Sequence, residues 1–277
     1  MELRISSTRK VVHYAVLIIL AILFLLPLVF IFFTAVKSNA DLASKPIYAF
    51  PAKIHWENFV KAWDQGKMSM YMKNTLFICL VKVPLGILIE ALAAFALTRL
   101  KFRWSIPMFS FFLIGMMIPM QATLVPLNML LNAIHLKGTY PGIFLIYLGF
   151  GIPFGIMILR GFFRTIPKEL DEAALIDGCS DMGKFLRIIL PLSMPAIATL
   201  IIFDFMATWN EFLLAQIFIS DQSMRTITLG LLAFRGDWST DYTLMSAAVL
   251  ISVLPVMIVY LLFQKYFVNG LAGSVKG

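Results

Sequence analysis

The sequence predicts an all-α, polytopic membrane protein with six transmembrane helices. Of its 277 residues, 60% are hydrophobic and 14% are charged, and the mean hydropathy is +0.88. Soluble domains are roughly 45–50% apolar and about 25% charged, so this chain lacks the polar residues that would cover a water-soluble globule. Its apolar residues also form runs long enough to cross a bilayer, which takes about 20 residues. These observations exclude a soluble domain and a disordered chain.

Six apolar stretches predict the spans. They cover residues 12–36, 71–97, 106–127, 141–159, 196–219 and 244–267. Each stretch contains or borders a proline, which transmembrane helices tolerate because neighbouring groups satisfy the freed carbonyls. We expect the first stretch to remain as a span, since its apolar core is longer than the roughly 7–15 residues of a cleaved signal peptide.

Clusters of basic residues predict the orientation of the chain. Lys and Arg gather at the N-terminus, between the second and third stretches, between the fourth and fifth, and in the C-terminal tail. These residues are Arg4, Arg9, Lys10, Arg99, Lys101, Arg103, Arg160, Arg164, Lys168, Lys184, Arg187, Lys265 and Lys276. Because short, dense basic clusters stay in the cytoplasm, we expect the N- and C-termini to be cytoplasmic.

The connection 160–195 is expected on the same side and is predicted to hold two short helices. Pro167 suits a first helical turn, and acidic residues follow it where the helix dipole favours carboxylates. Gly178 suits the left-handed end of that helix, and Ser180 is a candidate N-cap for the next one. Pro191 is expected to end the second helix. These helix-start and helix-end signals predict a projecting helix–turn–helix. They favour a segment that docks on another protein; the alternative is an ordinary amphipathic surface loop.

The same connection carries a family signature. Glu172, Ala173, Ala174, Gly178, Ile188, Leu190 and Pro191 stand in the pattern EAA…G…I-LP, within EAALIDGCSDMGKFLRIILP. This pattern resembles the EAA signature of permease subunits of ABC importers. The segment 209–212, WNEF, is similar to one found in carbohydrate-uptake permeases, and the ending 270–277 resembles that of the maltose-permease G-subunit type. The resemblance extends over nearly the whole chain.

The resemblance implies a single transmembrane domain over residues 1–277 with the type I ABC importer permease fold, in a bacterial or archaeal cytoplasmic membrane. The implied function is that of a permease subunit in an ATP-driven, binding-protein-dependent carbohydrate importer, with a di- or oligosaccharide favoured. The implied partners are a homologous second permease subunit, two ATPase subunits, an extracytoplasmic sugar-binding protein and membrane lipid.

By the same resemblance, the segment 160–195 is the EAA coupling loop, which sits in a cleft of the ATPase and couples ATP hydrolysis to alternating access. Ala173 and Ala174 would allow close contact with that cleft, and Glu172 would meet a basic group. MgATP would be bound by the partner ATPase, and this chain would bind no cofactor.

Polar residues in the fifth stretch form a second candidate site. Asp204, Thr208 and Glu211 follow i, i+4, i+7 spacing and so share one helix face, with Trp209 and Asn210 beside them. Two interpretations stand equal: a wall of the sugar pathway, and a buried network that holds helices or a partner subunit. A proton relay is a weaker third. In the second stretch, Lys82 and Glu90 lie on a similar face but are too far apart for a direct ion pair.

Two weaker signals accompany these sites. Gly151 and Gly155 form a small-xxx-small pair that would suit a close helix crossing. The outer segments 38–70 and 221–243 contain Trp56, Trp63 and Trp238, which belong either to an interfacial aromatic belt or to a surface for the binding protein.

The residues favour a transport subunit over an enzyme. The segment 178–184, GCSDMGK, has the spacing of a phosphate-binding loop, but Phe185 stands where Ser or Thr must bind Mg²⁺. The histidines and the two cysteines show no metal-ligand spacing, so no metal site is expected. An ion- or proton-coupled secondary transporter would explain the intramembrane carboxylates but not the EAA signature. The apolar stretches contain no motif of an intramembrane protease, which disfavours that class. No nucleic-acid partner is expected, because the basic residues flank the predicted spans.

Overall fold

The computed structural model describes residues 7–236 and 239–274. Helices account for 79% of the structure, and the described residues contain no β-strand. The chain divides into two compact units. Unit 1 comprises residues 1–69 and 230–253, and unit 2 comprises residues 70–229 and 254–277, within the described ranges.

Unit 1 begins with α1 (Ser7–Ala35), whose apolar side chains are almost all exposed. Two short helices, α2 (Asn39–Ser44) and α3 (Glu57–Gln65), follow, and the short helix η3 (Leu231–Phe234) precedes α14 (Tyr242–Ser274). The buried Lys37 ammonium donates to the Ile47 carbonyl at 2.9 Å. Asn58 donates to the carbonyls of Ala35 and Lys37 at 2.8 and 2.9 Å, so polar side chains fix the loop after α1.

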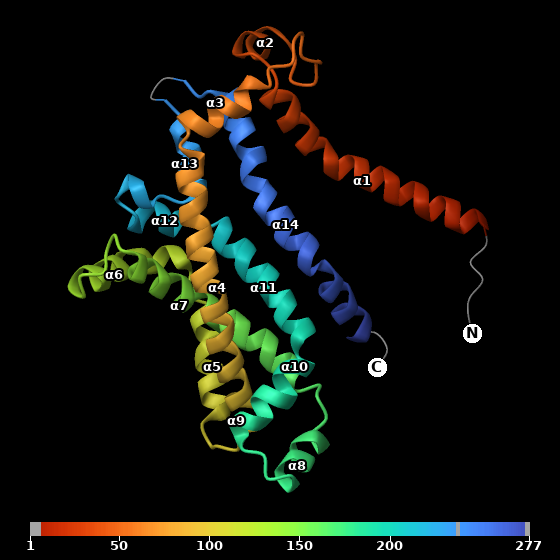
Figure 1. Cartoon of the computed structure of the whole chain (residues 1–277), viewed down its shortest axis with the longest axis vertical. Helices are drawn as coiled ribbons and strands as arrows, with labels where there is room; N and C mark the ends of the chain where they lie inside the picture. Colours follow the sequence, from red (N-terminus) through yellow and green to blue (C-terminus); the bar gives the residue numbers. More distant parts are fainter. Residues whose placement is uncertain (1–6, 237–238, 275–277) are drawn as a thin grey trace. The chain divides into compact units, whose positions relative to one another are not determined.

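Unit 2 is built around α4 (Met68–Arg99) and α7 (Tyr140–Phe163). The helix α7 packs against α5 (Ser105–Met116) and α11 (Met194–Trp209), as Figure 1 shows. Thr139 caps α7 by accepting from the Gly142 N–H at 3.2 Å. The remaining elements are α6 (Met120–Ala133), α12 (Leu213–Phe218), η2 (Gln222–Met224) and α13 (Ile227–Gly230).

The EAA loop, residues 160–195, folds as the two predicted helices with two differences. The first helix is α8 (Glu169–Ile176), and Pro167 precedes it instead of lying in its first turn. Gly178 has a φ of +71°, the left-handed conformation expected of it, and Ser180 caps α9 (Asp181–Lys184) by accepting from the Gly183 N–H.

Pro191 does not end the second helix, which is the other difference. After α9 the chain forms a π turn, η1 (Phe185–Ile189), and continues through Pro191 in α10 (Leu190–Leu192). The N–H of Leu190 bonds the Phe185 carbonyl, five residues back. Proline has no N–H and its ring presses on the carbonyl four residues earlier, and the wider π turn accommodates both.

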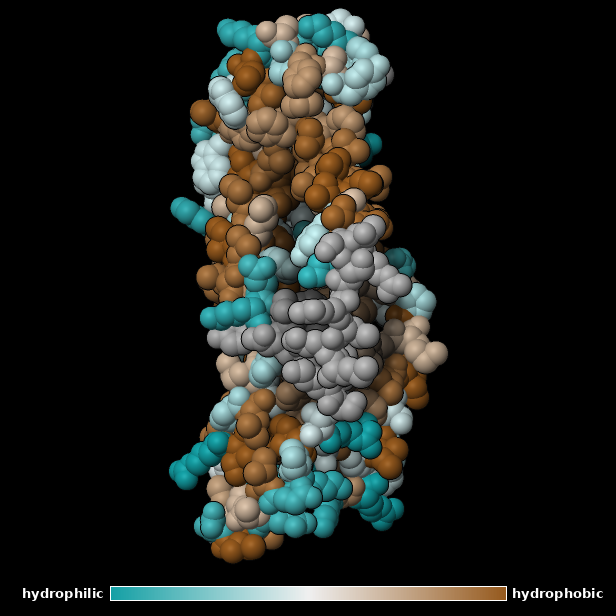
Figure 2. Space-filling view, turned by 90° about the vertical axis from the view of Figure 1, so that its right-hand side faces the viewer, coloured by the Kyte–Doolittle hydropathy of each residue, from teal (hydrophilic) through white to brown (hydrophobic). Residues whose placement is uncertain are grey.

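Four described helices are long and apolar enough to cross a membrane: Lys10–Ala35 within α1, α4, α7, and Tyr242–Lys265 within α14. They agree with the first, second, fourth and sixth predicted stretches. Two bent helix pairs bring the number to six if each pair is one span. In Figure 2, hydrophobic residues cover much of the visible face, and hydrophilic residues gather toward the lower end, where α8 lies in Figure 1.

The third and fifth stretches are not the single helices that the sequence predicts. The pair α5–α6 is bent by 101° around Pro119, whose extended backbone starts α6. Proline disfavours the helical conformation in the residue before it, so a regular helix stops there. In the fifth stretch, α11 ends at Trp209 and a new short helix begins at Leu213, so residues 196–219 contain a break. The bend of 76° lies earlier, between the helix over Asp181–Leu192 and α11.

Candidate functional site

The EAA loop presents most of its signature residues at the surface. Glu172, Ala173, Gly178 and Pro191 are exposed, whereas Ala174 is only 4% exposed and faces the protein. Nothing lies within 4 Å of the position that a Cβ would take at Gly178, so its left-handed backbone explains the glycine. The exposed signature residues at the surface of this loop are therefore small or rigid, apart from the carboxylate of Glu172.

Two residues of the EAA signature lie partly inside the protein instead of at its surface. Ile188 and Leu190 are half-buried and pack against a core cluster that joins four elements. Its buried members include Phe95 of α4, Phe163 of α7, Ile189 of η1 and Leu200 of α11. The end of the EAA loop is thus packed firmly onto the membrane helices.

The helix α8 also carries exposed apolar side chains, which the sequence pattern did not predict. Leu175 is 68% exposed and Ile176 is 87% exposed, directly after the EAA residues. A contiguous exposed apolar patch is typical of an interaction surface. The sequence does contain a sign of this surface, since two branched apolar residues directly follow the EAA residues.

Arg99, at the last residue of α4, joins the EAA loop to the membrane helices. Its Nη1 donates to Asp171 Oδ2 of α8 at 2.6 Å. Its Nη2 donates to the carbonyl of Phe163, and to that of Ile166 at 2.8 Å. The Arg99 side chain is 6% exposed. In the sequence, Arg99 is recognisable only as one of the basic residues that predict the orientation of the chain.

Asp204 lies at a crossing of helices. Lys82 Nζ of α4 donates to its Oδ1 at 2.5 Å, and the two side chains are 3% and 7% exposed. Its Oδ2 has no partner among the described residues. The pair joins α4 to α11, which favours the interhelical network for Asp204. Lys82 and Glu90 do not pair, as the sequence predicted.

Two glycines of α7 make room for the charged side chains of α4. A Cβ at Gly151 would lie 2.8 Å from Lys82 Nζ, and one at Gly155 would overlap the Glu90 carboxyl group. Glu90 is fully buried and neither of its oxygens has a hydrogen-bond partner in the described part of the chain. The small-xxx-small pair therefore seats side chains of the crossing helix.

Glu211 lies beyond the end of α11, so it does not continue the predicted stripe. Its oxygens accept from the N–H groups of Leu214 and Ala215 at 2.7 and 2.9 Å, which caps α12. Tyr147 donates to Glu211 Oε2 at 2.7 Å, and Thr228 donates to the Glu211 carbonyl at 2.7 Å. Glu211 thereby holds α7, α12 and the start of α13 together.

The other pathway candidates differ in their exposure. Thr208 is 5% exposed and Trp209 is 1% exposed, with the Trp209 ring stacked on Phe205 at 5.5 Å. Asn210 is exposed at the break after α11. Of the five candidates in segment 204–211, Asn210 is therefore the one open to a solute in this conformation.

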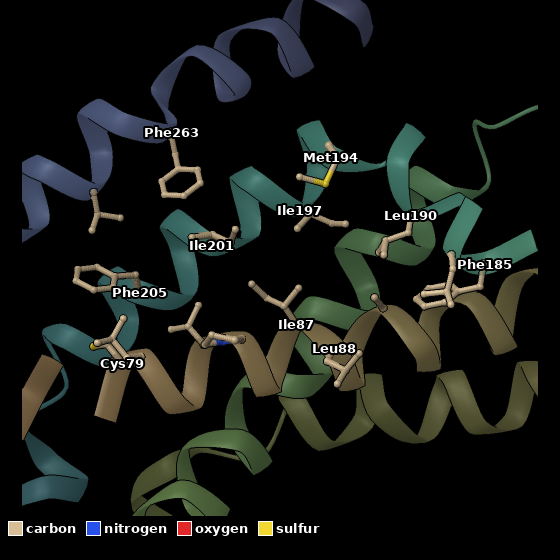
Figure 3. Close-up of a pocket in the computed structure, with 16 residues that line it drawn as sticks. Cys79, Ile87, Leu88, Phe185, Leu190, Met194, Ile197, Ile201, Phe205 and Phe263 are labelled. Atoms are coloured by element: carbon tan, nitrogen blue, oxygen red, sulfur yellow. The ribbon is translucent and has the colours of Figure 1, made fainter. Parts of the chain in front are cut away.

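A large cavity in unit 2 is apolar (Figure 3). It measures about 530 Å³ and lies between α4, the π turn, α11 and the later part of α14. Phe185, Leu190, Ile201 and Phe263 project toward it. Its lining offers no group that would bond sugar hydroxyls, so it is not a sugar site. It suits apolar side chains or lipid chains instead.

The described residues contain no group of three or more His, Cys, Asp or Glu side chains that could hold a metal ion. Of the expected outer tryptophans, Trp56 is 58% exposed and Trp63 is 39% exposed, and Trp238 lies outside the described residues. The C-terminal motif 270–277 lies only partly within them.

Comparison with known proteins decides the family. A model of the binding-protein-dependent transport system inner membrane component matches residues 82–273. The chain belongs to this family. The break after Trp209 and the EAA loop both lie inside the matched part. As a member of a membrane-permease family with several apolar helices, the chain is a multi-pass membrane protein.

Individual relatives agree. The probable ABC transporter permease protein YurM of Bacillus subtilis is 41% identical over 256 residues, which is 91% of this chain and 83% of that protein. The diacetylchitobiose uptake system permease protein NgcG of Streptomyces coelicolor is 32% identical over 275 residues, covering 98% of this chain and 89% of that protein. These relatives are transport permease subunits.

The fold has a solved counterpart. A chain of a bacterial ABC transporter involved in the import of the acidic polysaccharide alginate aligns with a TM-score of 0.82 and 22% identity, covering 96% of this chain and 100% of that one. The predicted all-α ABC importer permease fold is confirmed.

Proposed function

We propose that this chain is the permease subunit of an ATP-driven, binding-protein-dependent importer of di- or oligosaccharides in a bacterial or archaeal cytoplasmic membrane. The observation that carries the proposal is the family match over residues 82–273 together with an exposed EAA helix, α8. Support for a sugar substrate comes from NgcG, whose name gives diacetylchitobiose, and from the alginate importer.

In the proposed mechanism, α8 docks in a cleft of a partner ATPase, and closure of the ATPase dimer rocks the membrane helices between inward- and outward-facing states. Ala173 and the exposed Leu175 and Ile176 suit an apolar cleft, and Glu172 suits a basic group at its rim. MgATP binds to the two ATPase subunits, while this chain binds no cofactor and performs no covalent chemistry.

The complete importer would contain a homologous second permease subunit and an extracytoplasmic sugar-binding protein. We place the sugar pathway beside the break between α11 and α12, where Asn210 is exposed. Asp204 and Glu211 are engaged in bonds to other helices, so their role is to hold the wall of that pathway in place. Thr208 and Trp209 lie behind that wall in this conformation.

The test is reconstitution of the chain with a second permease subunit, the ATPase and the binding protein. The binding protein is first screened against diacetylchitobiose, maltose and raffinose, and the complex is then assayed for sugar-stimulated ATP hydrolysis and uptake in proteoliposomes. Stable co-purification of the ATPase and sugar-dependent hydrolysis are expected. Uptake by the chain alone, driven by an ion gradient, would instead establish the alternative of a secondary transporter.

A charge reversal tests the role of the EAA loop. Glu172→Arg is expected to leave the protein in the membrane and to separate ATP hydrolysis from uptake. Asp64→Arg, an exposed charge reversal in α3, is the matched control. Unchanged uptake in the Glu172 variant would exclude a coupling role for that carboxylate.

A further inference from the structure

Transmission of force from α8 needs a firm connection to the membrane helices. The described part of the EAA loop has one ion pair to a spanning helix, between Asp171 and Arg99. The remaining ion pair in this loop, between Lys184 and Asp181, is local to α9. The chemistry at Arg99 therefore decides how α8 is held.

Arg99 binds three acceptors at once. One arm of the guanidinium meets the Asp171 carboxylate in the first turn of α8, and the other meets carbonyls at the C-terminal end of α7 and in the turn after it. The last carbonyls of a helix carry partial negative charge and favour a cation. The planar fork of Arg can serve several acceptors in fixed directions, which a Lys ammonium cannot do.

The surroundings make this joint stiff. The Arg99 side chain is almost fully buried, and Phe163, whose carbonyl it bonds, belongs to the core cluster that also contains Phe95 and Leu159. A charge-assisted hydrogen bond is stronger where water is excluded. Movement of α8 is thus passed to α4 and α7 together, in addition to the covalent link through residues 164–168.

We propose that the ion pair of Arg99 and Asp171 is the joint that transmits movement of the EAA helix, α8, to α4 and α7. Both are therefore positioning residues in the coupling of ATP hydrolysis to uptake. This inference rests on the proposed function, since it names the residues through which the docked helix acts. It concerns neither the docking surface nor the sugar pathway.

The test compares Arg99→Gln, Asp171→Asn and the double variant in the reconstituted complex. The readouts are the amount of co-purified ATPase and the number of sugar molecules imported per ATP hydrolysed, with a sugar from the panel above. We expect normal assembly and a fall of about 10-fold in that ratio for each single variant, within the range usual for coupling between two sites. The double variant should be no worse than Arg99→Gln alone, because Asp171→Asn then removes a contact that is already lost.

Two further variants sharpen the result. Arg103→Gln removes an exposed arginine four residues away and should keep the wild-type ratio. Arg99→Lys keeps the charge but not the fork, so an intermediate ratio is expected. If Arg99→Gln fails to assemble, Asp171→Asn decides, because the Asp171 side chain is 21% exposed and an amide fits its place.

A wild-type ratio in Asp171→Asn, or effects of the two single variants that multiply in the double variant, would overturn the proposed joint. Failure of the proposed function is a separate observation, seen in the wild-type complex before any substitution as absence of ATPase binding or of sugar-dependent hydrolysis.

Discussion

Lys82 and Asp204 show how a single residue depends on its partner across the membrane interior. Removal of one member of a buried ion pair leaves the other charge unpaired, which costs about 3–5 kcal/mol, whereas replacement of both by apolar residues is often neutral. We expect Lys82→Met to lower the thermal stability of the detergent-solubilised protein strongly. Lys82→Met with Asp204→Leu should recover most of that loss.

The control for this pair is Lys73→Met on the same helix, where the lysine is exposed. It should leave the melting temperature, followed by size-exclusion chromatography after heating, close to that of the wild type. Equal losses in Lys73→Met and Lys82→Met would mean that the pair does not stabilise the crossing of α4 and α11.

The glycines of α7 give a second prediction at this scale. A methyl group at Gly155 would overlap the buried Glu90 carboxyl, so Gly155→Ala is expected to destabilise the protein by about 1–3 kcal/mol, the usual effect of overpacking. Gly149→Ala is the matched control on the same helix, because nothing lies within 4 Å of its added Cβ. Thermal unfolding of the two variants, measured side by side, should separate them clearly.

Sequence patterns reveal residues but not their partners on other helices. The i, i+4 spacing correctly put Asp204 and Thr208 on one face, and both are buried. The partner Lys82 stands on another helix, 122 positions earlier, beyond the reach of any local spacing rule. Arg99 was visible only as a positive charge, because its three acceptors come together through the packing of α4, α7 and α8.

At the scale of elements, the start of α14 depends on one carboxylate. Burial opposes the charge of Asp241, but hydrogen bonds from the backbone of Leu244, from Thr243 and from Asn39 outweigh it and hold the pKa of Asp241 below its usual value of 3.8. A lowered pKa in the folded state means that the ionised form stabilises the fold above pH 3.8. This contribution disappears as the pH falls through the lowered value.

Asp241→Asn should therefore differ most from the wild type at neutral pH. We expect the gap between their melting temperatures to be constant from pH 7 to about pH 5 and to shrink toward zero below the usual carboxyl pKa. Circular dichroism melts across this range are the measurement. A gap that widens on acidification would contradict the assigned role of the carboxylate as the helix cap.

Element boundaries depended on competing local effects. Gly178 and Ser180 were placed correctly because each has a specific backbone role, a left-handed φ and an N-cap. The break at Pro119 was missed because apolar content on both sides suggested one continuous helix. The break after Trp209 was missed because Glu211 was assigned to a helix face when its oxygens cap the next helix.

For the whole molecule, the basic clusters predict which side of the membrane each part occupies, and native cysteines offer a test. Cys179 lies in the EAA loop and is partly exposed, whereas Cys79 is 1% exposed. A membrane-impermeant maleimide should label Cys179 in inside-out vesicles and not in right-side-out vesicles.

The matched control is Cys179→Ser, which should abolish labelling in both preparations because Cys79 is shielded. Labelling of Cys179 from the outer face would reverse the orientation predicted from the basic residues and remove the EAA loop from reach of a cytoplasmic ATPase.

The π turn between α9 and α10 has a consequence for how the length of this loop can vary. A single π turn is equivalent to one residue inserted into an α-helix, and the widened turn absorbs it locally. In a regular α-helix, one inserted residue rotates everything beyond it by about 100°. Deletion of one residue within 185–189 would therefore convert the π turn into a regular α-helical turn. Ser180 would keep its orientation relative to the core residues of α11. Length variants at this turn should keep the EAA face aligned with the membrane helices, whereas a deletion between Met194 and Trp209 would misalign them.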